Sequence, residues 1–174
     1  PESLRGLNAA CQRRPSLMMR GTRQLTRQQI QDELDRLKSR LSPSSNVGEL
    51  TFSLETRRES LPDALALLRQ ILREPTLPPE ELKILQNAKV TRLEQESTDP
   101  TSLARVAVSR HINPFPPEDA RYVPSNSEEI ARWKELTRPD VARIYSEYLG
   151  AQHGELALVG DFDPAEAKPL LEQL

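Results

Sequence analysis

Two stretches of the sequence have the pattern of a β-strand, and they lie far apart. In residues 47–57, apolar Leu50, Phe52 and Leu54 alternate with polar residues, and about 100 residues later comes a compact apolar run at 155–159. An isolated two-stranded sheet is only marginally stable in water. The remaining strands are therefore expected either in residues 1–20 or in sequence outside these 174 residues, and we favour the second interpretation.

Apolar residues at helical spacing, each series preceded by a start signal, predict helices over most of the remaining chain. Thr26 and Gln29 have the spacing of a capping box, and the apolar residues that follow predict a helix over 26–41. The polar stretch 42–46 contains a proline and is expected to be a loop. Further helices are expected at 61–72, 80–98, 103–112, 127–136, 138–149 and 164–174.

This order of elements predicts an α+β fold in which helices pack on one face of a mostly antiparallel sheet. The sheet is expected to be incomplete, so residues 1–174 are interpreted as a single partial domain. Within it, residues 1–20 form a lead-in and residues 21–174 carry the helices and strands. Because the sequence begins without an initiator methionine, we expect it to be a fragment of a longer protein.

Composition narrows the classes of partner. The 24 Lys and Arg nearly balance the 26 Asp and Glu, which gives no electrostatic reason to expect nucleic acid as a partner. No apolar run approaches the roughly 20 residues of a membrane span. The lone Cys11 has no second cysteine with which to form an intramolecular disulfide.

The chain contains a series of different short motifs in a defined order. They lie at residues 17–22, 52–54, 61–68, 75–79, 99–100, 113–115, 136–141 and 158–164. In the order and spacing of these motifs, the chain resembles the pitrilysin/insulinase family of zinc metallopeptidases, the inverzincins. The resemblance covers about residues 16–174 and implies the fold of one half of such an enzyme.

The resemblance also shows where the zinc-binding motif of the family, H-x-x-E-H, would lie. Its two histidines fall on Gln12 and Ser16, its glutamate falls on Pro15, and the third zinc ligand of the family falls near Arg92. An amide is a poor zinc ligand, proline has no side-chain base, and a guanidinium repels Zn²⁺. The resemblance therefore implies a non-catalytic half without zinc, although the nearby residues 94–96 leave the register of the third ligand open.

Family members resemble a clamshell in which one half binds zinc and a homologous half closes over an unfolded peptide. The resemblance implies that this chain helps to shape the peptide-binding chamber, with zinc in a partner half of the same or another polypeptide. Phe52, Leu54 and Phe115 are the candidate contacts with the peptide or with that half. Alone, the chain is expected to be inactive. Two-half relatives are often exported bacterial proteins, which favours the periplasm.

Two other functions stay open. One is a structural or assembly subunit of the same fold that supports a partner and never touches substrate. The other is a helical interaction module with no connection to peptidases. An H-x-x-E-H motif upstream in the full gene would favour the chamber over the structural subunit. Absence of peptide binding by strand addition would favour either of the two alternatives.

The remaining reactive side chains have simpler interpretations. His111 and His153 have no second ligand at metal spacing, so surface or capping roles are expected. Asp161 and Asp163 form a D-x-D pair that suits a divalent cation, but a turn followed by a helix N-cap explains them without one. Cys11 lies beside arginines but has no nearby histidine, so a nucleophilic role is not expected.

Overall fold

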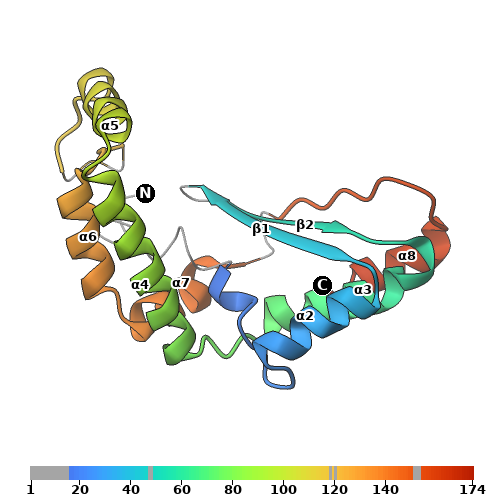
Figure 1. The fold of residues 1–174 in the computed structure, drawn as a ribbon. Coiled ribbons are helices and arrows are strands. Elements are labelled where there is room, and N and C mark those ends of the chain that lie inside the picture. The colour runs from blue at the N-terminus through green and yellow to red at the C-terminus, as the bar shows by residue number, and fades with distance from the viewer. Residues whose placement is uncertain (1–15, 47–48, 118, 120, 151–153) are drawn as a thin grey trace.

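The computed structural model describes residues 16–46, 49–117, 119, 121–150 and 154–174. Two groups of helices are arranged along one continuous core (Figure 1). The first group contains α2 (Arg27–Arg36), α3 (Leu61–Arg73) and α8 (Pro164–Leu171), with the 3-10 turn η2 (Arg58–Ser60) before α3. The second contains α4 (Pro79–Glu96), α5 (Pro100–Ile112), α6 (Asn126–Glu135) and α7 (Arg138–Tyr148).

A β-hairpin covers the first group of helices. It consists of β1 (Arg40–Asn46) and β2 (Glu49–Glu55), which pair in antiparallel register so that Pro43 lies opposite Phe52. The side chains of β2 alternate between exposed and half-buried, which confirms the predicted strand. The α2 and α3 helices lie on one face of this hairpin (Figure 1), as expected for the α+β fold.

Local capping explains where the helices begin. Side chains accept hydrogen bonds from the first-turn backbone of α2, α5, α6, α7 and α8; these caps are Thr26, Asp99, Ser125, Thr137 and Asp163. Those of α2, α6 and α7 are full capping boxes, and the one at Thr26 and Gln29 was predicted. All the expected helical segments are helices, with differences at their ends.

The predicted end of the first helix was wrong. Instead of continuing to residue 41, α2 ends at Arg36 because Lys38 adopts the left-handed conformation, with φ of 50°. The backbone N–H groups of Lys38 and Ser39 donate to the carbonyls of Asp35 and Leu34, at 3.0 Å and 2.9 Å. These two bonds form a Schellman motif, which turns the chain out of the helix and into β1.

Replacing Lys38 with glycine is expected to stabilise the protein by about 1 kcal/mol, because glycine adopts positive φ without the steric cost that a Cβ brings. Lys38 is exposed, so the change removes no buried side chain. Chemical denaturation followed by circular dichroism measures the difference. Lys134→Gly is the matched control, because Lys134 is an exposed lysine inside α6, where glycine is expected to destabilise by a similar amount. A destabilising Lys38→Gly would contradict the expectation.

The strand predicted at 155–159 does not form. Residues 154–159 have no regular secondary structure, and Val159 is 94% exposed. In the described part of the chain, no other strand pairs with this segment or with the hairpin. The stretch 42–46, expected to be a loop, instead belongs to β1.

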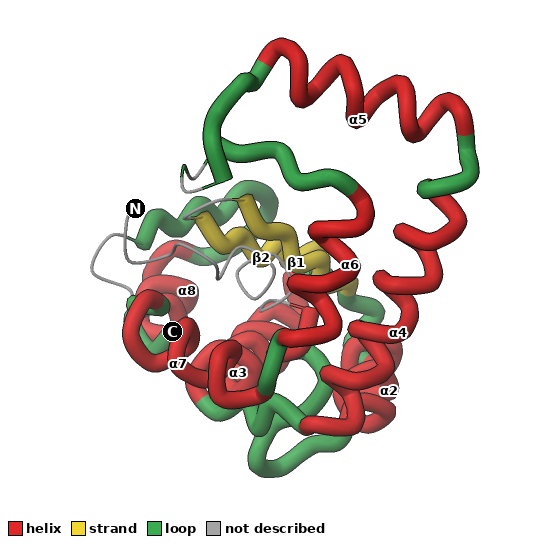
Figure 2. Tube along the Cα trace, turned by 90° about the vertical axis from the view of Figure 1, so that its left-hand side faces the viewer, coloured by secondary structure: helices red, strands yellow, loops and turns green. Residues whose placement is uncertain are grey.

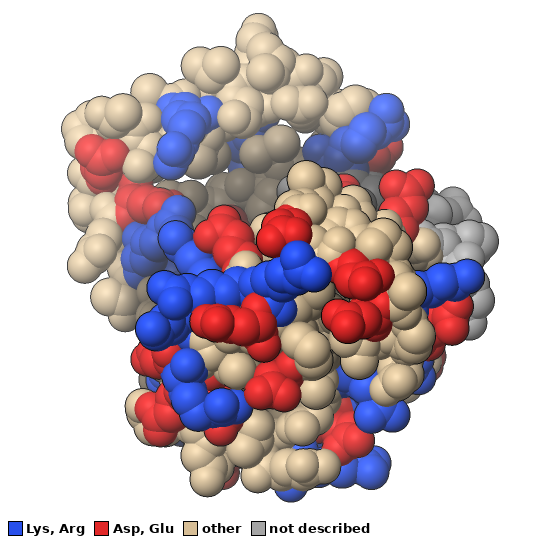
Figure 3. Space-filling model, turned by 90° about the vertical axis from the view of Figure 1, so that its right-hand side faces the viewer, with Lys and Arg blue, Asp and Glu red and all other residues tan. Residues whose placement is uncertain are grey.

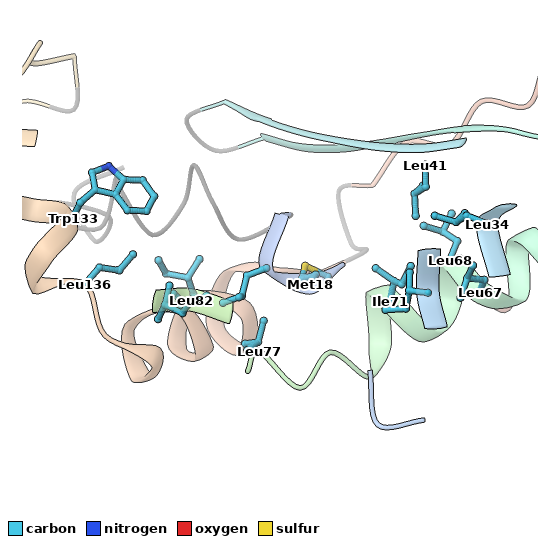
Figure 4. Packing of buried hydrophobic residues seen from close by; sticks show 14 of the residues in the cluster. Met18, Leu34, Leu41, Leu67, Leu68, Ile71, Leu77, Leu82, Trp133 and Leu136 are labelled. Carbon is cyan, nitrogen blue, oxygen red and sulfur yellow. The ribbon is translucent and has the colours of Figure 1, made fainter. Parts of the chain in front are cut away.

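Buried apolar side chains from both groups of helices form one core. Trp133, Leu136 and Leu82 fill it on the side of the second group, and residues of α2, β1 and α3 fill the other side. Met18 lies between the two (Figure 4) and is fully buried. The lead-in is therefore part of the core from residue 17 onward.

The two groups of helices are joined at what we call the central strap, residues 20–25 with residues 74–78. The amide of Thr76 donates to the carbonyl of Gly21 at 3.0 Å, and the amide of Arg23 donates to that of Glu74 at 3.1 Å. From α7, the Arg138 guanidinium donates to the carbonyls of Leu77 and Thr76, at 3.0 Å and 3.2 Å. The strap thus fixes the lead-in, the α3–α4 connection and α7 together. Within the second group, α4 and α6 lie side by side (Figure 2).

Candidate functional site

Of the four positions at which the resemblance places the zinc-binding residues of the family, the structure describes two, Ser16 and Arg92. Gln12 and Pro15 lie outside the described residues, and Ser16 begins the described part of the chain. Arg92 lies on α4 with its side chain 61% exposed, and its Nε donates to Glu96 Oε1 at 2.7 Å. This hydrogen bond raises the pKa of Arg92 and lowers that of Glu96. A guanidinium held in this way does not fit a zinc ligand.

The other candidate ligands that the structure describes do not come together as a metal site. Asp161 pairs with Arg58 at 2.7 Å, and Asp163 caps α8. His111 is exposed in the last turn of α5, while His153 and Cys11 lie outside the described residues. Among the residues described, no group of three His, Cys, Asp or Glu side chains is placed to hold a metal ion.

Phe52 and Leu54 lie on the face of β2 that packs on the helices. Both are half-buried against the core, while Thr51, Ser53 and Glu55 are exposed on the opposite face. The hairpin therefore presents a polar surface outward and uses its apolar side chains to hold itself on the helices. Sequence alternation revealed the two faces but not which of them faces solvent.

Phe115 lies in another part of the molecule, in the connection between α5 and α6. It is half-buried, and the guanidinium of Arg121 lies 3.7 Å from the centre of its ring. Asp119 holds that guanidinium through two hydrogen bonds, of 3.0 Å and 2.8 Å. The ring is thus covered by a cation–π contact.

The same connection is tied to α6 through Glu128. This carboxylate accepts hydrogen bonds from the Ser125 backbone at 2.7 Å, from the Ser125 hydroxyl at 2.8 Å and from Tyr122 at 2.8 and 2.9 Å. The hydrogen bonds from Ser125, together with that of Tyr122, lower the pKa of Glu128 to about 2. Arg110 of α5 approaches the same carboxylate at 3.3 Å, so three elements meet here.

A pocket of about 910 Å³ that the sequence did not reveal opens beside the central strap. Three segments line it: residues 16–31, the start of α4 with the linker before it, and Pro43 of β1. A volume of this size suits a small molecule or a few peptide side chains. The only indication of this pocket in the sequence is the group of arginines at positions 20, 23 and 27. The sequence does not show that the fold brings them to one cavity.

The arginines that line this pocket differ in how closely they pair with a carboxylate. Arg20 Nη1 lies 2.6 Å from Glu81 Oε2, and both side chains are mostly buried. Arg27 Nη1 reaches the same oxygen only at 3.8 Å, which exceeds a hydrogen bond. Among the described residues, Arg23 has no ion pair. Arg23 and Arg27 therefore line the pocket without a hydrogen bond to a described carboxylate.

Apolar side chains are also exposed, on α5. Leu103, Val108 and Ile112 are 46%, 60% and 68% exposed, and α5 has no buried residue. Charges elsewhere are mixed: Figure 3 shows Lys and Arg interspersed with Asp and Glu over the face in view. Within the described ranges, no helix combines the length and the apolar character needed to cross a membrane.

Comparisons with known proteins identify a family and a fold for this chain. The family model for insulinase, peptidase family M16, matches residues 13–113. The crystal structure of a peptidase M16 inactive domain from Pseudomonas fluorescens has a TM-score of 0.76 and 17% identity; the match covers 94% of this chain and 39% of that one. The periplasmic protease PqqL from Escherichia coli has a TM-score of 0.58 and 13% identity, with 85% of this chain and 15% of that chain covered. No curated protein sequence matches.

Proposed function

The chain belongs to the insulinase family of peptidases, peptidase family M16, and we propose that it is part of a non-catalytic half that shapes a peptide-binding chamber. In this proposal a homologous half, in the same polypeptide or a separate subunit, holds the zinc and performs hydrolysis. This chain spans about two fifths of the length of the inactive domain that it resembles. Its role is therefore that of a segment of the chamber wall.

The observation that carries this proposal is a fold similar to that of a peptidase M16 inactive domain. It is supported by the Arg92 guanidinium, which pairs with Glu96 near the position where the resemblance places a zinc ligand. A cation paired with Glu96 at this place opposes the binding of Zn²⁺. The likeness to a periplasmic protease supports placing the enzyme in the periplasm. The exposed apolar side chains of α5 offer area that a partner half would cover.

The hairpin is the part of the chain that we assign to peptide contact. In the described residues β1 pairs with β2 alone, so its other edge has unpaired backbone groups. Pro43 lies within β1, and proline within a sheet is confined to edge strands and strand ends. An extended peptide would pair with this edge, while Phe52 and Leu54 hold the hairpin on the helices and Phe115 lies elsewhere.

Hydrogen exchange measured by NMR tests this assignment. An acetylated and amidated peptide of alternating threonine and valine, added at up to about 1 mM, is expected to slow the exchange of amides in β1 by about tenfold at saturation. Amides at the centres of α3 and α6 serve as an internal control and should not change. The peptide should also be bound rather than cleaved, because this chain supplies no zinc ligands at the motif positions.

The control peptide has the same side chains but N-methyl groups on alternate amides. Methylation removes the donors needed for strand addition, so this peptide should bind at least about tenfold more weakly. Equal protection by both peptides would exclude strand addition. Absence of protection by either would overturn the peptide-contact role and favour a structural or assembly subunit.

A further inference from the structure

The pocket beside the central strap has chemistry that selects among peptides. We infer that it receives a carboxylate side chain, glutamate or aspartate, from an extended peptide lying along the edge of β1. This inference rests on the proposed function, because the peptide backbone is positioned by the hairpin. It adds a preference in substrate chemistry: acidic residues at one position of the peptide.

The position of Pro43 connects the pocket to the strand edge. Pro43 belongs to β1 and also lines the pocket. Side chains directly opposite each other on neighbouring strands project from the same face of a sheet. A peptide residue paired beside Pro43 therefore projects its side chain toward the pocket, while the residues before and after it project to the other face.

The arginines of the pocket favour a carboxylate as the occupant. Glu81 pairs closely with Arg20, at 2.6 Å, and more loosely with Arg27, at 3.8 Å. The three arginines that line the pocket therefore face only two lining carboxylates, those of Glu81 and the exposed Glu80. An arginine presents two parallel N–H donors that match a carboxylate, and such charge-assisted bonds are stronger than neutral ones. A basic peptide residue would instead find Glu81 already paired and two guanidinium groups nearby.

Apolar walls strengthen the preference. Met19, Leu25, Ile30 and Pro78 line the pocket beside the arginines. Apolar surroundings reduce the local dielectric constant, so a carboxylate placed between these walls and the guanidinium groups is attracted more strongly than at an open surface. The methylene groups of a glutamate side chain would contact the same apolar atoms.

Calorimetric titration of the full 174-residue chain with two matched peptides tests the inference. Both are acetylated and amidated with the sequence Thr-Val-X-Val-Thr, where X is glutamate in one and glutamine in the other. The glutamate peptide is expected to bind about tenfold more tightly, since it alone forms an ion pair with arginine, with two carboxylate oxygens as acceptors. Raising the salt concentration to about 1 M, where the Debye length is about 3 Å, should reduce this advantage.

Variants of the chain locate the contact. Arg27→Gln and Arg23→Gln should each reduce the advantage of glutamate over glutamine severalfold, because binding of the glutamate peptide weakens more than binding of the glutamine peptide. Arg57→Gln is the matched control, because Arg57 is also an exposed arginine but lies outside the pocket. It should keep the full advantage. Circular dichroism of each variant confirms that the fold is retained.

The outcomes separate this inference from the proposed function. Equal binding of the two peptides to the unmodified chain overturns the carboxylate preference but leaves the peptide-contact role intact. An advantage of glutamate that persists in both pocket variants overturns the assignment to this pocket. Absence of binding by either peptide overturns the inference together with the proposed role of the hairpin.

Discussion

Replacing Trp133 with alanine is expected to lower the free energy of unfolding by about 3–5 kcal/mol, a large share of the stability of a single domain. Trp133 is fully buried in the core, where it lies near Leu136 and Leu82 (Figure 4). Alanine removes the contacts of the indole ring and leaves a cavity between α6 and its neighbours that the surrounding helices fill only in part. Denaturant unfolding followed by far-UV circular dichroism measures the loss.

Two further variants make this measurement specific. Trp133→Phe keeps an aromatic ring and should cost clearly less than alanine, because the cavity is smaller. Leu103→Ala removes a large apolar side chain from α5, where it is 46% exposed, and should change stability by less than about 0.5 kcal/mol. Circular dichroism is required because Trp133 is the sole tryptophan of the sequence. A loss at Trp133 no larger than that at Leu103 would show that this part of the core does not limit stability.

Helix starts were predictable because their signals are local. Thr26 lies three residues before Gln29, and this spacing alone identifies a capping box. The end of the same helix was not predictable, because it depends on Lys38 adopting positive φ, a conformation that lysine disfavours. Because Leu41 continued the helical spacing, the predicted helix was more than one turn too long. In the structure Leu41 belongs to β1, and its side chain is buried in the core from there.

The strands were harder to predict, because a strand forms only where another segment pairs with it. Residues 155–159 have high strand propensity but do not form a strand, while 40–46, rich in serine and containing Pro43, do. Pairing with β2 decides the second case, and pairing is a property of distant segments. The described residues contain no partner for 155–159. The predicted shortage of strands agrees with this outcome, although the assignment of the second strand was wrong.

For the candidate site, too, features that depend on local sequence could be predicted, whereas features that the fold assembles could not. The sequence resemblance placed Arg92 near a position where the family has a zinc ligand, because this comparison needs only motif spacing. The pocket was missed because the fold assembles it from residues 16–31, Pro43 and the start of α4. Phe115 was a candidate contact because it lies in a proline-rich loop and is not readily assigned to the core, but the sequence does not indicate that Arg121 covers its ring.

Replacing Gly21 with alanine is expected to destabilise the protein by about 1–3 kcal/mol through overpacking of the central strap. A Cβ at Gly21 would lie 2.8 Å from Thr76 Oγ1 and 3.2 Å from Pro78 Cγ. The strap resists the separation that would relieve these contacts, because the Thr76 amide donates to the Gly21 carbonyl at 3.0 Å. Gly21 has no positive φ, so the cost is steric rather than conformational.

A second substitution tests this cause. Thr76→Ala removes the nearest clashing atom, so the double variant Gly21→Ala with Thr76→Ala should recover part of the loss, with a coupling of about 0.5–3 kcal/mol. The contact with Pro78 limits the rescue. At Gly160, where φ is 139° and a Cβ would have no described atom within 4 Å, alanine is strained by its backbone, and Thr76→Ala should not rescue it. Denaturant unfolding of the single and double variants measures this coupling. Additive losses at Gly21 and Thr76 would contradict the steric explanation and mean that the strap adjusts to the added Cβ. The two groups of helices would then be held together mainly by the core around Met18.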